Sequence, residues 1–126
     1  MMRHPWPGLA LLTLIGCWGG TLPPGLANYD PQQARETLTT ALDAWKAGQA
    51  GQLSRRTPAI QFVDDDLVAG CRLLDYELLD PEQSARPFES VRVQLRLRDR
   101  RGREWTREVG YQIILQPVRA IVRGDG

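Results

Sequence analysis

The sequence has little histidine and cysteine, and it lacks long apolar runs. Among 126 residues there is one histidine, His4, and there are two cysteines, Cys17 and Cys71. His4 falls in a segment that we expect to be cleaved off, which excludes histidine-ligated zinc and histidine general bases from the mature chain. No apolar run approaches the ~20 residues of a membrane-spanning helix, which argues against a polytopic membrane protein. Glycine-rich phosphate loops, nucleophile elbows and CxxC pairs are also absent.

The composition that remains is that of an ordinary globular protein. Hydrophobic residues make up 42% and charged residues 25% of the chain, so neither a disordered nor a fibrous protein is indicated. One domain is expected at this length.

The N-terminal residues have the pattern of a secretory signal peptide. Arg3 precedes the apolar run Leu9–Ile15, and the small residue Gly16 follows it. A basic start, a short apolar region and a small residue at the cleavage point are typical of such signals. We therefore expect residues 1–16 to be a signal peptide.

The end of this segment reads Leu14-Ile15-Gly16-Cys17. It resembles the lipobox of bacterial lipoproteins, and the resemblance implies that the Cys17 thiol receives a diacylglyceryl group and that Cys17 becomes the first mature residue. The expected location is then the bacterial cell envelope, with the membrane as one partner through the N-terminal lipid. Secretion without acylation is the alternative, and it would allow a Cys17–Cys71 disulfide. With Cys17 acylated, Cys71 is expected to be a small buried apolar residue.

After the cysteine, residues 17–29 read as a flexible tether, residues 30–123 as one domain and residues 124–126 as a tail. Asp30-Pro31-Gln32-Gln33 is typical of a helix start, with an acidic cap and a proline in the first turn. Apolar residues then recur at helical spacing, namely Ala34, Leu38, Ala41, Leu42 and Trp45. We expect a helix of four to five turns that ends near Gly48.

From Gly70 onward the apolar period changes from 3.6 to 2. Residues 91–98 alternate without error, and residues 71–79, 104–116 and 118–123 read as further strands. Residues 99–103 form the expected hairpin turn, with Gly102 available for a positive φ. Residues 58–63 read only as a short extended piece, and residues 65–69 as a helical turn.

This order predicts an α+β fold, in which one long N-terminal helix packs on a curved antiparallel sheet of three to five strands. The arrangement resembles the cystatin-like roll and the larger nuclear transport factor 2-like cone. The resemblance covers residues 30–123 and depends on the helix end at 45–48, the segment 64–70 before the first long strand, and the closing hairpin. It concerns architecture alone, and it includes no diagnostic motif.

Positive charge is concentrated in the C-terminal part. Residues 91–123 carry nine arginines and three acidic residues, whereas residues 30–90 carry a net charge of −5. We consider an anion or protein-partner contact at six arginines: Arg92, Arg96, Arg98, Arg100, Arg101 and Arg103. The alternative is a solvated strand face on which the arginines pair with Glu104 and Glu108. Nucleic acid is not an expected partner, because no aromatic side chain shares the arginine face.

Three consecutive acids, Asp64-Asp65-Asp66, precede a short helical pattern. Their simplest role is to cap that helix. The alternative is a pocket in which Asp64 faces the inward tyrosines Tyr76 and Tyr111, as a carboxylate and a tyrosine do in some cone-shaped relatives. The spacing does not match a calcium loop, and we expect no metal and no cofactor.

These observations favour a non-enzymatic binding or scaffolding module in the cell envelope, whose partner is another envelope protein. The alternative is a small-molecule binder or an enzyme with a cone-shaped pocket. An enclosed cavity with Asp64 and a tyrosine facing into it would favour the alternative.

Overall fold

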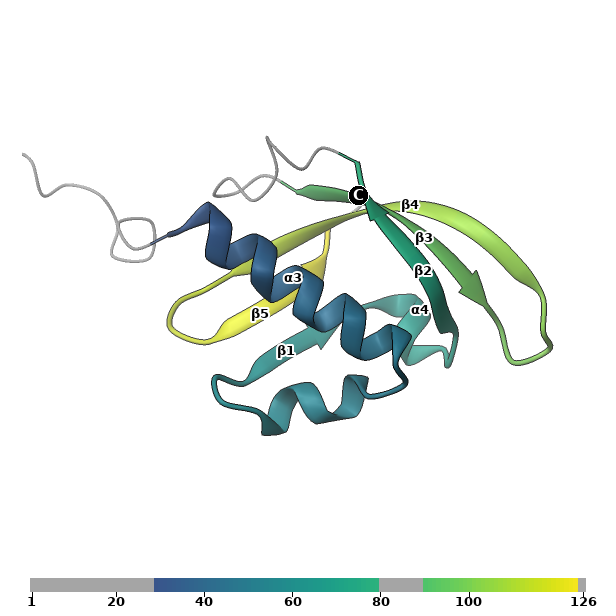
Figure 1. The fold of residues 1–126 in the computed structure, drawn as a ribbon, viewed down its shortest axis with the longest axis horizontal. Helices are drawn as coiled ribbons and strands as arrows, with labels where there is room; N and C mark the ends of the chain where they lie inside the picture. Colours follow the sequence, from purple (N-terminus) through teal and green to yellow (C-terminus); the bar gives the residue numbers. More distant parts are fainter. Residues whose placement is uncertain (1–28, 80–89, 125–126) are drawn as a thin grey trace, which may run out of the picture.

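A computed structural model describes residues 29–79 and 90–124. Its elements are α3 (Pro31–Lys46), η1 (Ala50–Arg55), β1 (Ile60–Val63), α4 (Asp65–Val68), β2 (Arg72–Leu78), β3 (Val91–Arg98), β4 (Glu104–Ile114) and β5 (Arg119–Arg123) (Figure 1). The predicted signal peptide, the lipidation site Cys17 and all of the tether except Tyr29 lie outside the described residues.

The five strands form one curled sheet, a half-barrel, and α3 lies across its inner face (Figure 1). The strand order is β1-β5-β4-β3-β2. The predicted α+β class is thus confirmed. The prediction of a wholly antiparallel sheet is wrong, because β1 pairs in parallel with β5, with Ile60 opposite Arg119 and Val63 opposite Val122. A four-residue strand has too few positions to show a period, and its partner strand lies at the far end of the chain.

Helix α3 occupies the position predicted after Asp30. The Asp30 side chain accepts a hydrogen bond from the Gln32 backbone N–H at 2.9 Å, which satisfies one free donor of the first turn. The predicted apolar residues are buried against the sheet: Ala34, Leu38, Ala41, Leu42 and Trp45. With 16 residues α3 is of moderate length, so the described residues show no long N-terminal helix and that part of the prediction is wrong.

Strands β3 and β4 supply most of the inner sheet face. In β3, Val91, Val93, Leu95 and Leu97 are buried while Arg92, Gln94 and Arg96 between them are exposed, as the alternation predicted. In β4 the buried positions are Val109, Tyr111 and Ile113. Cys71 is buried in the same core, as predicted for a small apolar residue. The core therefore lies between α3 and the concave side of the sheet.

Candidate functional site

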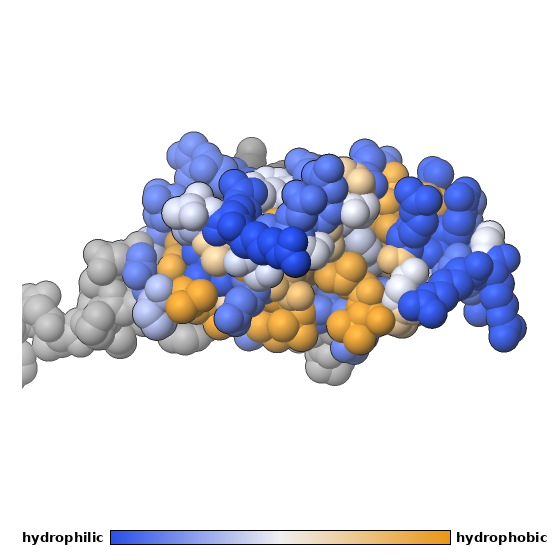
Figure 2. All heavy atoms as spheres, turned by 90° about the horizontal axis from the view of Figure 1, so that it is seen from below, coloured by the Kyte–Doolittle hydropathy of each residue, from blue (hydrophilic) through white to orange (hydrophobic). Residues whose placement is uncertain are grey.

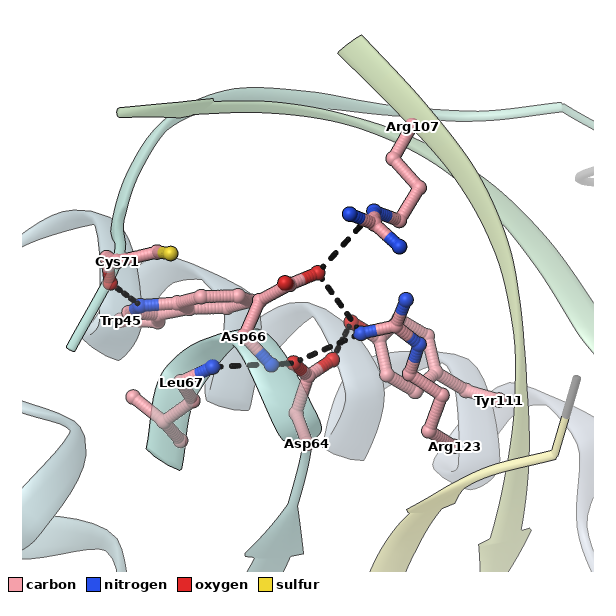
Figure 3. A network of polar contacts seen from close by, with 8 residues as sticks. All are labelled: Trp45, Asp64, Asp66, Leu67, Cys71, Arg107, Tyr111 and Arg123. Atoms are coloured by element: carbon pink, nitrogen blue, oxygen red, sulfur yellow. Dashed lines mark hydrogen bonds and ion pairs between the residues drawn. The ribbon is translucent and has the colours of Figure 1, made fainter. Parts of the chain in front are cut away.

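A polar network lies on the inner side of the sheet, where β1 leads into α4 (Figure 3). It begins with Asp64, whose extended backbone (φ −146°, ψ 130°) places its side chain at the start of α4. The Asp64 Oδ1 atom accepts hydrogen bonds from the backbone N–H groups of Asp66 at 2.7 Å and Leu67 at 3.1 Å. Asp64 is thus the N-cap of α4, as the capping interpretation predicted.

The other oxygen of this carboxylate contacts β4. The Tyr111 hydroxyl donates to Asp64 Oδ2 at 2.6 Å, and both residues are 0% exposed. Tyr111 points inward by the alternation of β4, and its ring packs on that of Phe62 with centroids 5.8 Å apart. Two of the three residues predicted to line a pocket are therefore in direct contact.

Two arginines complete the network. The Arg123 Nη1 atom, from β5, lies 3.2 Å from Asp64 Oδ1 and 2.8 Å from Asp66 Oδ2, and the Arg123 side chain is 6% exposed. The Arg107 Nε atom, from β4, lies 3.4 Å from Asp66 Oδ2. Two carboxylates thus face two guanidinium groups. Such pairing is what a buried charge requires, and the network runs from the interior at Tyr111 to the half-exposed Arg107.

Arg107 and Arg123 were not predicted from the sequence as members of this site. The signal that could have found them is strand alternation, which places every second residue on the inner face of the sheet. Position 107 belongs to the inward series of β4 that includes Val109 and Tyr111, and position 123 follows the buried Ile121 by two residues. A charged residue at an inward position indicates a buried partner of opposite charge, and Asp64 and Asp66 are those partners.

The Asp64 carboxylate has no acceptor site left for a substrate. It receives four donors: two backbone N–H groups, the Tyr111 hydroxyl and the Arg123 guanidinium. A carboxylate offers about four lone-pair sites. Burial, together with the charge of Asp64 and the hydrogen bond to it, raises the pKa of Tyr111 well above its usual value. Tyr111 therefore remains a protonated donor at neutral pH.

Tyr76 does not join Asp64 and Tyr111. Its hydroxyl donates to Asp43 Oδ1 at 2.7 Å and ties β2 to α3. Burial and the hydrogen bond to Asp43 raise the pKa of Tyr76 to about 12. The physical reason for the separation is register: β2 is the far edge strand, and Tyr76 lies opposite Leu95, whereas Tyr111 lies opposite Val91. Both tyrosines were predicted to face inward by strand alternation, but this did not bring them together.

A pocket of about 250 Å³ lies over β2, β3 and β4, away from the polar network. Its lining is mostly outward-facing and polar, namely Asp75, Tyr76, Glu77, Gln94, Arg96 and Thr106. Neither Asp64 nor Tyr111 contributes to it.

The arginines of the β3–β4 hairpin are largely engaged with neighbouring groups. Arg92 is ion-paired with Glu108, and Arg98 pairs with Glu104 at 2.8 Å. Both are cross-strand pairs of exposed groups, which contribute little to stability because water and salt screen the charges.

The remaining four arginines lie near the turn or in the pocket just described. Arg103 Nε lies 3.6 Å from Asp99 Oδ2, and the backbone N–H of Arg101 donates to Asp99 Oδ1. The Arg100 guanidinium covers Gly70, where an added Cβ would lie 2.4 Å from Arg100 Nε. Arg96 lines the pocket. The geometry thus favours the solvated-face interpretation for Arg92 and Arg98, and the anion or partner contact stays a prediction.

Within residues 29–79 and 90–124, no group of three or more His, Cys, Asp or Glu side chains is placed to hold a metal ion. No helix in this part of the chain is long and apolar enough to cross a membrane.

No protein-family model, no curated protein and no solved structure matches this chain.

Proposed function

We propose that the protein is an exported lipoprotein, anchored in a bacterial membrane through acylated Cys17, whose α+β domain is a non-enzymatic binding or scaffolding module of the cell envelope. The anchoring is supported by the sequence Leu14–Cys17 and the apolar run before it. We also propose that the domain is a roll of the cystatin-like or nuclear transport factor 2-like type, which is supported by a helix that lies in the curve of the sheet.

The non-enzymatic role is supported by one observation, the four donors on the Asp64 carboxylate. A general acid or base must reach its substrate within hydrogen-bond distance. Asp64 and Tyr111 are fully buried and satisfy each other, so a substrate would have to displace these internal contacts. The same contacts argue for a structural role, in which the network joins β1, α4, β4 and β5. The alternative of an enzyme with a cone-shaped pocket lacks such support.

The partner is proposed to be another envelope protein. The hairpin turn supports this, because Arg100, Arg101 and Arg103 are exposed there within a segment of net charge +6. An acidic surface would complement it.

The intact mass of the protein extracted from bacterial membranes tests the anchoring. We expect the mass of residues 17–126 plus a diacylglyceryl group, with or without a further acyl chain on the new N-terminus. Cys17→Ser should abolish the modification and the cleavage before residue 17. Cys71→Ser is the matched control and should leave both unchanged. An unmodified Cys17 in the wild-type protein would contradict the proposal.

A further inference from the structure

Exposed apolar side chains form a strip along one side of the domain. Five large hydrophobic residues of the described chain are exposed by a third or more of their surface: Val63, Val68, Ile114, Val118 and Val122. Val63 lies opposite Val122 in the β1–β5 pair, and Ile114 lies opposite Ala120 in the β4–β5 pair. By strand alternation Val63, Ile114 and Val122 face outward, away from α3, whereas Val68 ends α4 and Val118 lies in the β4–β5 turn. Figure 2, which looks from the side of β1 and α4, shows apolar residues gathered on this side.

Charged side chains do not interrupt the strip where it crosses the strands. The other outward positions of this region are Gln61, Gln112 and Ala120. The outer face of β3 differs, because Arg92, Arg96 and Arg98 cover it. The outer surface of the sheet is therefore divided into a charged part over β3 and an uncharged apolar part over β5 and β1.

The strip begins at the end of the domain where α3 starts. The start of α3 and the β4–β5 turn lie at the same end of the long axis (Figure 1). Val118 is in that turn. Tyr29 follows Cys17 by twelve positions, so the chain between them spans at most about 40 Å when fully extended. An acylated Cys17 would therefore keep this end of the domain within about 40 Å of the bilayer.

Basic residues lie near this end. Arg55 and Arg56 precede β1, and Arg119 begins β5 opposite Ile60. The first two are exposed, whereas Arg119 is half-buried, faces the inner side by alternation and adjoins the strip only through its neighbour Val118. Arginine beside exposed valine is the combination that suits an interface of anionic headgroups and acyl chains.

We propose that this strip, with Val118 at its tip, rests on the surface of the bilayer that holds the Cys17 lipid, whereas the β3–β4 turn at the opposite end of the domain does not enter the membrane. The proposal rests on the anchoring proposed above. A second copy of the chain is a poorer occupant, because a stable interface needs about 800 Å² and 20–30 residues from each partner. A bilayer needs no such complementary shape.

The test uses the acylated full-length protein in vesicles of phosphatidylcholine and phosphatidylglycerol. A nitroxide label is attached at Val118→Cys, or at the matched control Arg101→Cys in the β3–β4 turn, each with Cys71→Ser to remove the other thiol. Both sites are exposed turn positions, so the labels should not disturb the core. Accessibility to oxygen, which partitions into lipid, is compared with accessibility to a water-soluble nickel chelate. We expect the ratio of oxygen to nickel accessibility to be several-fold higher at position 118 than at position 101.

Equal ratios at the two positions, in protein whose mass confirms acylation, would overturn the proposal while leaving the anchoring intact. A protein without the acyl mass would instead overturn the anchoring. Dipolar broadening between Val118 labels on different chains would show that a second copy covers the strip, and it would also overturn the bilayer contact.

Discussion

Replacing Asp64 with alanine is expected to lower the free energy of unfolding by about 3–5 kcal/mol, because one partner of a buried ion pair is removed. The change deletes the cap of α4 and the acceptor of the Tyr111 hydroxyl. It also leaves the Arg123 guanidinium, whose side chain is 6% exposed, with Asp66 as its remaining carboxylate in this network. Urea unfolding followed by tryptophan fluorescence measures the loss.

The matched control is Asp65→Ala, at the next residue. Asp65 carries the same charge but is exposed in the first turn of α4, so its removal should cost at most about 1 kcal/mol through the helix dipole. If Asp64→Ala does not fold, Tyr111→Phe removes only one hydroxyl and should cost about 1–3 kcal/mol. Equal losses for Asp64→Ala and Asp65→Ala would contradict a structural role for the network.

Replacing Trp45 with alanine is also expected to cost about 3–5 kcal/mol, since a large buried side chain leaves a cavity. Trp45 is 4% exposed. Its indole Nε1 donates to the Cys71 carbonyl at 3.0 Å, and its ring meets Phe62 edge-on at 5.9 Å between centroids. The side chain thus joins α3 to β1 and to the start of β2. The midpoint and slope of urea unfolding measure this loss.

Trp45→Phe separates the two contributions. Phenylalanine keeps most of the ring contact but cannot donate to the Cys71 carbonyl, so a loss of about 1–3 kcal/mol is expected for a buried acceptor left unsatisfied. A loss below about 1 kcal/mol for Trp45→Ala would mean that this face of α3 is not core.

The helices and strands whose apolar residues recur with a clear period could be predicted from the sequence. The alternation of residues 91–98 placed every buried residue of β3 correctly, because a strand with one buried face must alternate. Asp30 and Pro31 fixed the start of α3, since few residue types suit a helix N-terminus. The parallel pairing of β1 could not be predicted, because its partner strand β5 lies far away along the sequence.

The site was predicted in part. Strand alternation correctly predicted Tyr111 as an inward-facing residue, and the acidic run correctly pointed to Asp64. The same alternation also selected Tyr76, which the edge position of β2 places against Asp43 instead. Arg107 and Arg123 were missed, because an arginine at an inward strand position is recognised as part of a site only when its carboxylate partner from another element is known.

The protonation state of the tyrosines makes the stability of the folded protein depend on pH. The pKa values of Tyr29, Tyr76 and Tyr111 are all raised, with burial as the largest cause. A phenol whose folded pKa exceeds its unfolded value of about 10 contributes its full stability below pH 10. That contribution is lost as pH rises, through about 12 for Tyr76 and beyond for the more deeply buried Tyr111.

The most direct test of a closed interior is therefore an alkaline titration of tyrosinate absorbance, in the wild-type protein and in Tyr111→Phe, with circular dichroism recorded on the same samples. We predict that the Tyr111 phenol ionises only when the protein unfolds, so that the two folded proteins have the same absorbance at pH 10. Reversible ionisation near pH 10, present in the folded wild type and missing in Tyr111→Phe, would show that solvent reaches Asp64 and Tyr111 and would contradict a sealed structural network.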